Sequence, residues 1–184
     1  MSKSRNYSPS LKLTAALAML VAISIVLGKY LALSVGDVLR FSFENLPIIF
    51  AGIAFGPLGG VLVAVTADLV GCLLVAYAVN PLVTLGAAVI GLCAGFTPAL
   101  LKKYTSVSDK GVVIVTVTLS HLLGSVVIKT LGLAVFYDMP IIILMLWRLL
   151  NYAIVSTGEI LLIYVLLKRD GVRMEIDKLR SKSK

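Results

Sequence analysis

Four basic side chains lie within or beside long apolar stretches, where a charge is unusual: Lys29, Arg40, Lys129 and Arg148. Ammonium and guanidinium groups bind carboxylates, and arginine can hold one carboxylate through two parallel hydrogen bonds. Charges inside a membrane are costly, usually face the interior of a helix bundle and often mark a substrate path. These residues therefore indicate a binding site for an anion.

The depth of each base decides how strongly it supports such a site. Lys29 and Lys129 could instead extend to the lipid headgroups, and Arg40 could be an ordinary exposed loop residue. Arg148 is about seven or eight residues into its apolar stretch, roughly 10–12 Å deep at 1.5 Å per residue. Because that depth prevents a comfortable reach to the interface, a pocket or a buried pair is the better interpretation of Arg148.

Polar and aromatic residues near these bases complete the candidate site. Asp68 lies near the middle of an apolar stretch without a basic neighbour, so it must pair across helices, be protonated or meet a ligand donor. Asn80, Trp147 and Asn151 could supply hydrogen bonds or stack on a ring. The candidate substrate-binding residues are Arg40, Asp68, Asn80, Lys129, Trp147, Arg148 and Asn151.

The sequence contains no arrangement typical of catalysis or metal binding. It has no carboxylate pair at helical spacing, no HExxH helix and no Walker A loop. Cys72 and Cys93 lie in apolar runs and are interpreted as small buried hydrophobes. The single histidine, His121, is more typical of a hydrogen-bonded core residue than of a ligand, and the roles of His121 and Glu159 stay open. We expect a protein that is not an enzyme and holds no metal or cofactor.

The composition indicates an integral membrane protein that is surrounded by lipid. Its 184 residues are 59% hydrophobic and 14% charged, and the mean hydropathy is +1.03. Soluble domains carry about 25% charged residues. The net charge of +8 comes from Lys and Arg gathered at three breaks between apolar stretches, as cytoplasmic flanks require. The charge therefore reports membrane topology and not binding to nucleic acid.

The positive flanks also determine the number of membrane spans. An even number of spans must separate the N-terminus from the Lys102–Lys103 loop if both are cytoplasmic. Residues 41–79 hold no Lys or Arg and are long enough for two spans of about 20 residues. We therefore predict an all-α bundle of six transmembrane helices in a single membrane domain, 1–184, with both termini cytoplasmic. The expected helices are 11–29, 43–57, 59–78, 82–101, 112–135 and 140–167, followed by a basic cytoplasmic tail, 168–184.

The stretch LRFSFENLPIIFAGIAFGPLGGVLVAVTADLVG, from residue 39, carries a family resemblance. It resembles the signature region of the substrate-binding S components of energy-coupling factor (ECF) vitamin transporters, and within them the folate group. Residues 13–75 resemble the family well, and residues 147–167 do so more loosely. The matching pieces are Arg40-Phe41-Ser42-Phe43, Pro47-Ile48, Gly52–Pro57 and Ala67-Asp68.

The resemblance implies capture of extracellular folate at the membrane of a bacterial cell. It implies two kinds of partner, a transmembrane T component and two cytosolic ATPases. Ala18 and Ala22 match the Ala-x-x-x-Ala face that S components are thought to press against their membrane partner, and small residues four apart allow close helix approach. The alternatives are an S component for another vitamin, such as pantothenate or riboflavin, and a stand-alone secondary transporter.

Overall fold

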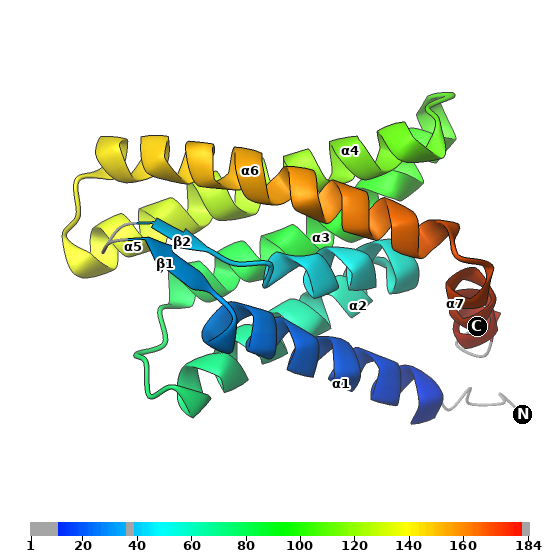
Figure 1. Ribbon diagram of the computed structural model, residues 1–184, viewed down its shortest axis with the longest axis horizontal. Helices are drawn as coiled ribbons and strands as arrows, with labels where there is room; N and C mark the ends of the chain where they lie inside the picture. The colour runs from blue at the N-terminus through cyan, green and yellow to red at the C-terminus, as the bar shows by residue number, and fades with distance from the viewer. Residues whose placement is uncertain (1–10, 36–38, 182–184) are drawn as a thin grey trace, which may run out of the picture.

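The computed structural model describes residues 11–35 and 39–181, which form a bundle of long helices with one short hairpin (Figure 1). Helices suit this chain because a helix satisfies its own backbone hydrogen bonds inside a membrane. Two segments, η1 and η2, have π-helical hydrogen bonding. The elements are α1 (Leu11–Ile25), η1 (Val26–Tyr30), β1 (Leu33–Val35), β2 (Leu39–Phe41), α2 (Asn45–Leu74), α3 (Pro81–Tyr104), α4 (Asp109–Ser120), η2 (His121–Lys129), α5 (Thr130–Tyr137), α6 (Ile141–Lys168) and α7 (Asp170–Ser181).

The long element α2 consists of two helical halves separated by a break. Gly56 has φ 85° and ψ −179°, a conformation that glycine adopts without steric cost, and Pro57 follows it. Proline has no N–H, so the helical hydrogen bond to Ile53 O cannot form. The break falls inside the glycine- and proline-rich stretch where the sequence indicates that a helix stops.

Counted with this break, the described part of the chain has six apolar helical segments, and the prediction of an all-α membrane bundle is confirmed. Within residues 11–35 and 39–181, five helical stretches are long and apolar enough to cross a membrane when the two halves of α2 are counted together. The span expected at 112–135 corresponds to α4, η2 and α5 in succession. The fold class follows from composition, whereas the change to π-helical geometry in η1 and η2 had no visible signal in the sequence.

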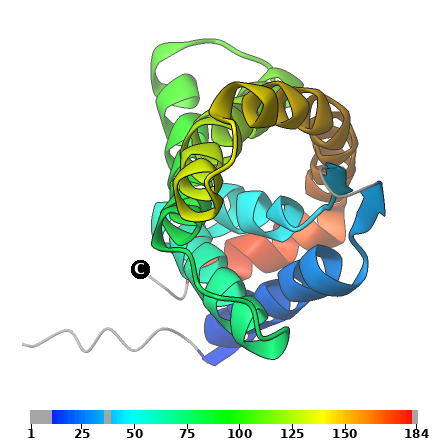
Figure 2. The ribbon, with the colours of Figure 1, turned by 90° about the vertical axis from the view of Figure 1, so that its left-hand side faces the viewer.

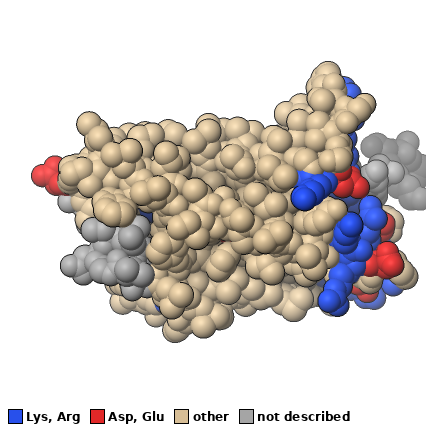
Figure 3. Space-filling view, turned by 45° about the horizontal axis from the view of Figure 1, so that its top comes forward, with Lys and Arg blue, Asp and Glu red and all other residues tan. Residues whose placement is uncertain are grey.

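The surface is that of an integral membrane protein. Large apolar side chains are exposed along the helices, among them Leu62, Leu73, Ile142 and Ile154. Figure 3 shows the middle of the molecule almost without charged residues, while Lys and Arg gather at one end. Lipid tails solvate such an apolar band. We refer below to the end with α7 as the basic end; its assignment to the cytoplasm rests on the positive-inside rule.

The segment between η1 and α2 contains the hairpin of β1 and β2, at the end of the molecule that faces the viewer in Figure 2. The two strands are antiparallel, with Ser34 opposite Arg40. They lie at the end of the bundle opposite α7 (Figure 1). The stretch expected as a tail is helical from Asp170 to Ser181, and this helix lies across the basic end. The first residues of α1 lie at the same end as α7, which agrees with an even number of crossings.

Close backbone contacts join the two halves of α2 to α3. A Cβ at Gly60 would lie 2.5 Å from Gly91 O, and one at Gly52 would lie 2.6 Å from Ala94 Cβ. The core around this contact contains Ile49, Val63 and other buried aliphatic residues of α2, α3, α4 and α6. Glycine and alanine allow this approach because they lack bulky side chains. The α2–α3 contact therefore depends on small residues at these positions.

We expect Gly91→Val to destabilise the bundle, because its side chain would meet the backbone of Gly60 and Val61, which cannot rotate away. Overpacking of a core costs about 1–3 kcal/mol, and a backbone clash belongs at the upper end of that range. Thermal unfolding of the purified protein in detergent measures the effect. Gly171→Ala is the control because nothing lies within 4 Å of a Cβ at Gly171. Equal melting temperatures for the two variants would contradict the contact.

Candidate binding site

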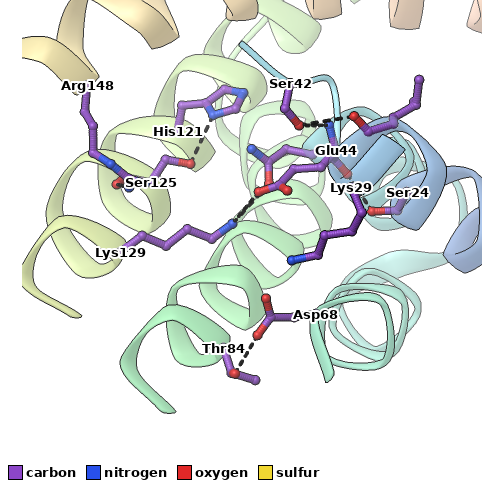
Figure 4. A network of polar contacts seen from close by, with 12 residues as sticks. Ser24, Lys29, Ser42, Glu44, Asp68, Thr84, His121, Ser125, Lys129 and Arg148 are labelled. Carbon is purple, nitrogen blue, oxygen red and sulfur yellow. Dashed lines mark hydrogen bonds and ion pairs between the residues drawn. The ribbon is translucent and has the colours of Figure 1, made fainter. Parts of the chain in front are cut away.

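Lys129, at the end of η2, is a buried cation with 4% of its surface exposed. Its Nζ donates to Glu44 Oε1 at 3.2 Å and to Asn45 Oδ1 at 3.5 Å (Figure 4). Gly86 of α3 leaves room for its aliphatic stem, since a Cβ there would lie 2.6 Å from Lys129 Cγ. A buried charge is tolerated only when it is paired and hydrogen-bonded. Lys129 is therefore neutralised within the fold.

A second carboxylate, Asp68, lies beside this ion pair. Thr84 Oγ1 donates to Asp68 Oδ2 at 2.6 Å, so Asp68 is bonded to the neighbouring helix α3 (Figure 4). Lys29, Glu44, Asp68 and Lys129 all line a cavity of about 20 Å³. This volume is enough for one water molecule, which requires roughly 10–15 Å³. Two cations and two carboxylates thus surround one small polar cavity between α1, α2, α3 and η2.

Arg148, on α6, is held by a different set of contacts. Its Nη1 donates to Ser125 O at 2.9 Å, and its Cζ lies 5.9 Å from the centre of the Tyr152 ring. Within residues 11–35 and 39–181, no carboxylate pairs with its guanidinium. Arginine has five N–H donors, and Ser125 O uses one of them. Arg148 therefore has donors that an anionic ligand could use.

The contacts of Arg148 continue into a buried network around His121. The rings of Tyr152 and His121 stack with centroids 4.7 Å apart. His121 Nδ1 lies 3.2 Å from Ser125 Oγ, and His121 Nε2 pairs with Glu159. His121 is 2% exposed and Glu159 is completely buried. The two residues whose roles the sequence left open therefore connect η2 to α6 below Arg148.

The other candidate residues differ in their surroundings. Asn80 is the N-cap of α3, accepting from Leu82 N and Val83 N and donating to Gly132 O at 2.8 Å. This is a structural role, and it engages both the oxygen and the amino group of the side chain. Asn151 is buried on α6 three residues after Arg148, whereas Trp147 is 42% exposed. The backbone of Arg40 belongs to β2, but its side chain lies outside the described part of the protein.

Sequence reasoning missed Glu44 and Asn45 as partners of Lys129. Both precede Pro47 at the start of α2, where a charged residue opens an apolar run. That position was a signal for a role at the site, but the pairing of residues 85 positions apart has no local signature. Tyr152 was also missed, although it lies four residues after Arg148, on the same helix face.

The proposed partner face on α1 is accessible. Ala18 and Ala22 are both exposed, and their spacing places them on one side of the helix. Exposed Met19 and Ile23 flank them. An exposed pair of small residues is available for close contact with a second membrane helix.

Comparison with known proteins gives one family and a shared fold. A family model described as "ECF transporter, substrate-specific component" matches residues 12–167. A solved structure described as "Crystal structure of FolT bound with folic acid" is similar with a TM-score of 0.66 at 24% identity, covering 84% of this chain and 90% of that chain. One described as "Structure and mechanism of the S component of a bacterial ECF transporter" gives 0.63 at 24% identity, covering 86% and 98%. No curated protein matches the chain.

The Glu44–Lys129 pair predicts strong coupling between two substitutions. Removing one partner of a fully buried pair costs about 3–5 kcal/mol. Because the Glu44 side chain is 30% exposed, we expect Glu44→Gln or Lys129→Met alone to cost less than that. The double variant leaves no isolated charge, so its free energy of unfolding should fall by clearly less than the sum of the single effects. Unfolding of the four proteins in detergent measures this coupling. Additive losses would show that the two side chains do not depend on each other.

Proposed function

Because the chain belongs to the family of substrate-specific components of ECF transporters, we propose that it captures folate from outside the cell for ATP-driven uptake. The sequence resemblance to the folate group supports this choice, as does the similarity in fold to a FolT structure bound with folic acid. The proposal depends most on Arg148, which has a guanidinium without a carboxylate partner among the described residues.

The chemical groups of folate fit the charges of the candidate binding site. Folate carries two carboxylates, and Arg148 can grip one of them bidentately. Lys129 is already paired with Glu44, so it would contribute by exchanging part of that pairing for the ligand. Asp68 accepts from Thr84 and retains capacity to accept from the donors of the pterin edge. On α6, Trp147 directly precedes Arg148, and Asn151 lies three residues after it. Arg40 belongs to the hairpin of β1 and β2.

Uptake in this proposal requires partners for energy. A transmembrane T component would contact the face of Ala18 and Ala22, and two cytosolic ATPases would supply the driving force. The chain itself has no Walker A loop. The role proposed for this subunit is therefore capture, with release driven from outside the chain.

Folate binding tests the substrate directly, and the single tryptophan, Trp147, is a natural reporter because it adjoins Arg148. Arg148→Ala should weaken binding by about 10- to 100-fold, since a hydrogen bond to a charged group contributes about 1.5–3 kcal/mol. Tryptophan fluorescence, calibrated by radiolabelled folate, measures the affinity. Arg169→Ala is the control because Arg169 is exposed at the basic end.

Two results would contradict the choice of folate. Unchanged affinity in Arg148→Ala would remove this residue from the site. Binding of riboflavin or pantothenate, with no folate binding below micromolar concentration, would favour the other vitamins. Riboflavin has no carboxylate, so its affinity should not depend on Arg148.

The partner face predicts a separation between binding and uptake. Ala18→Leu with Ala22→Leu should abolish uptake by the reconstituted complex and leave folate affinity unchanged, because bulky side chains prevent close helix approach. Ala153→Leu, an exposed substitution on α6, is the matched control. Uptake that survives the double substitution would refute the assigned face. Uptake by this chain alone in liposomes would favour a secondary transporter.

A further inference from the structure

A second and larger cavity lies at the basic end, away from the candidate binding site. Its volume is about 630 Å³. Its walls come from the break in α2, the end of α3, the beginning of α4, the end of α6 and the inner side of α7. Small-molecule sites in proteins occupy about 300–1,000 Å³. The cavity therefore has room for a ligand of moderate size.

The charges around this cavity are predominantly positive. Lys102, Lys168, Arg173 and Arg180 line it, against two carboxylates, Asp109 and Asp177. Lys102 Nζ lies 3.4 Å from Asp109 Oδ1 in a pair that is largely exposed. Three of these cationic side chains have no carboxylate partner in the described part of the chain: Lys168, whose Nζ lies 5.0 Å from the Tyr164 ring centre, Arg173, and Arg180, which bonds to backbone carbonyls.

Arg180 fixes α7 as one wall of the cavity. Its Nε donates to Ala54 O at 2.6 Å and its Nη2 donates to Ile53 O at 2.9 Å. These carbonyls end the first half of α2, where Pro57 cannot donate to Ile53 O. Ile176, 8% exposed, anchors the same helix through its apolar side. The α7 wall of this open cavity is thus held in place by the capped end of a helix half and by a packed side chain.

The remaining lining of the cavity is apolar and continuous with the membrane-spanning helices. Val112 and Val113 come from the beginning of α4, and Leu167 comes from the end of α6. A ligand that places negative charge beside Arg173 and Lys168 would therefore have apolar surface directly behind the charge. Figure 3 shows basic side chains gathered at this end, next to the uncharged band. Basic side chains beside an apolar surface are expected at the level of the lipid headgroups.

We propose that this cavity binds the headgroup of an anionic phospholipid. The phosphodiester lies against Arg173 and Lys168, and an acyl chain follows the apolar surface of Val112 and Leu167. Basic pockets between membrane helices are a recognised setting for anionic headgroups, and arginine is well suited to phosphate oxygens. Bound lipid would connect Lys168 on α6 to Arg173 on α7 through its phosphate group. The proposal does not depend on the identity of the vitamin.

Titration of the full-length protein with lipid tests the proposal. Purified protein in a non-ionic detergent receives phosphatidylglycerol or phosphatidylcholine, and thermal unfolding and native mass spectrometry report binding. We expect saturable stabilisation and a retained lipid adduct with phosphatidylglycerol only. Lys168→Gln with Arg173→Gln should weaken apparent affinity by about 10- to 30-fold, as expected for two basic residues near an anionic headgroup.

The matched control removes two charges at the same end but outside the cavity. Lys103→Gln with Lys178→Gln changes the net charge by the same amount, and neither residue lines the cavity. The control should retain the affinity of the unaltered protein. The single variant Arg173→Lys, which keeps the positive charge, should bind the lipid more tightly than the single variant Arg173→Gln. Melting temperatures without lipid separate loss of fold from loss of binding.

Three outcomes would overturn the lipid site. Equal weakening in the control pair would mean that surface charge alone attracts the lipid. Equal stabilisation by inorganic phosphate at the same concentration would mean that a free anion and not a lipid occupies the cavity. A change of oligomeric state with Lys168→Gln and Arg173→Gln, without lipid binding, would indicate a protein occupant.

Discussion

The reversal of the chain at Gly56 and Pro57 is the feature on which the rest of the structure depends. A helix break leaves carbonyl groups without intrahelical donors, and these groups need other partners. Arg180 donates to Ala54 O and Ile53 O at this point. Small residues of α3 allow the backbones of both halves of α2 to approach the α3 backbone closely. The break is therefore stabilised both by packing and by a hydrogen-bond donor from the far end of the chain.

The same reversal assembles the acidic side of the candidate site. Glu44 precedes Gly56 and Asp68 follows it by equal numbers of residues, so each lies about 18 Å from the break along its own helical half at 1.5 Å per residue. Once the halves turn back on each other, the two carboxylates come to the same level. Both line the small polar cavity with Lys29 and Lys129. Moving the break by one residue would shorten one half and lengthen the other by about 1.5 Å each, so the two carboxylates would shift relative to each other by about 3 Å.

Counting residues along a helix predicts the depth of a side chain such as Arg148, because helical rise is constant. The rotation of each helix about its axis has no such local rule. The sequence did not predict that Lys129 would be paired with Glu44, because the azimuth of each helix depends on tertiary packing. Asn80 illustrates a missed local signal. An asparagine before Pro81 is typical of a helix start, and the structure uses it as a cap.

The two bases of the site differ in the one property that anion capture requires. Lys129 is neutralised by Glu44, whereas Arg148 bonds to the carbonyl of Ser125. A carbonyl orients a guanidinium without cancelling its charge. Ser125 is itself fixed, because its hydroxyl contacts His121, which pairs with Glu159 on the same helix as Arg148. The buried pair therefore holds α6 against η2 and keeps Arg148 in place. Removing the charge of Arg148 would then remove attraction for an anion, while the pairing of Lys129 would stay intact.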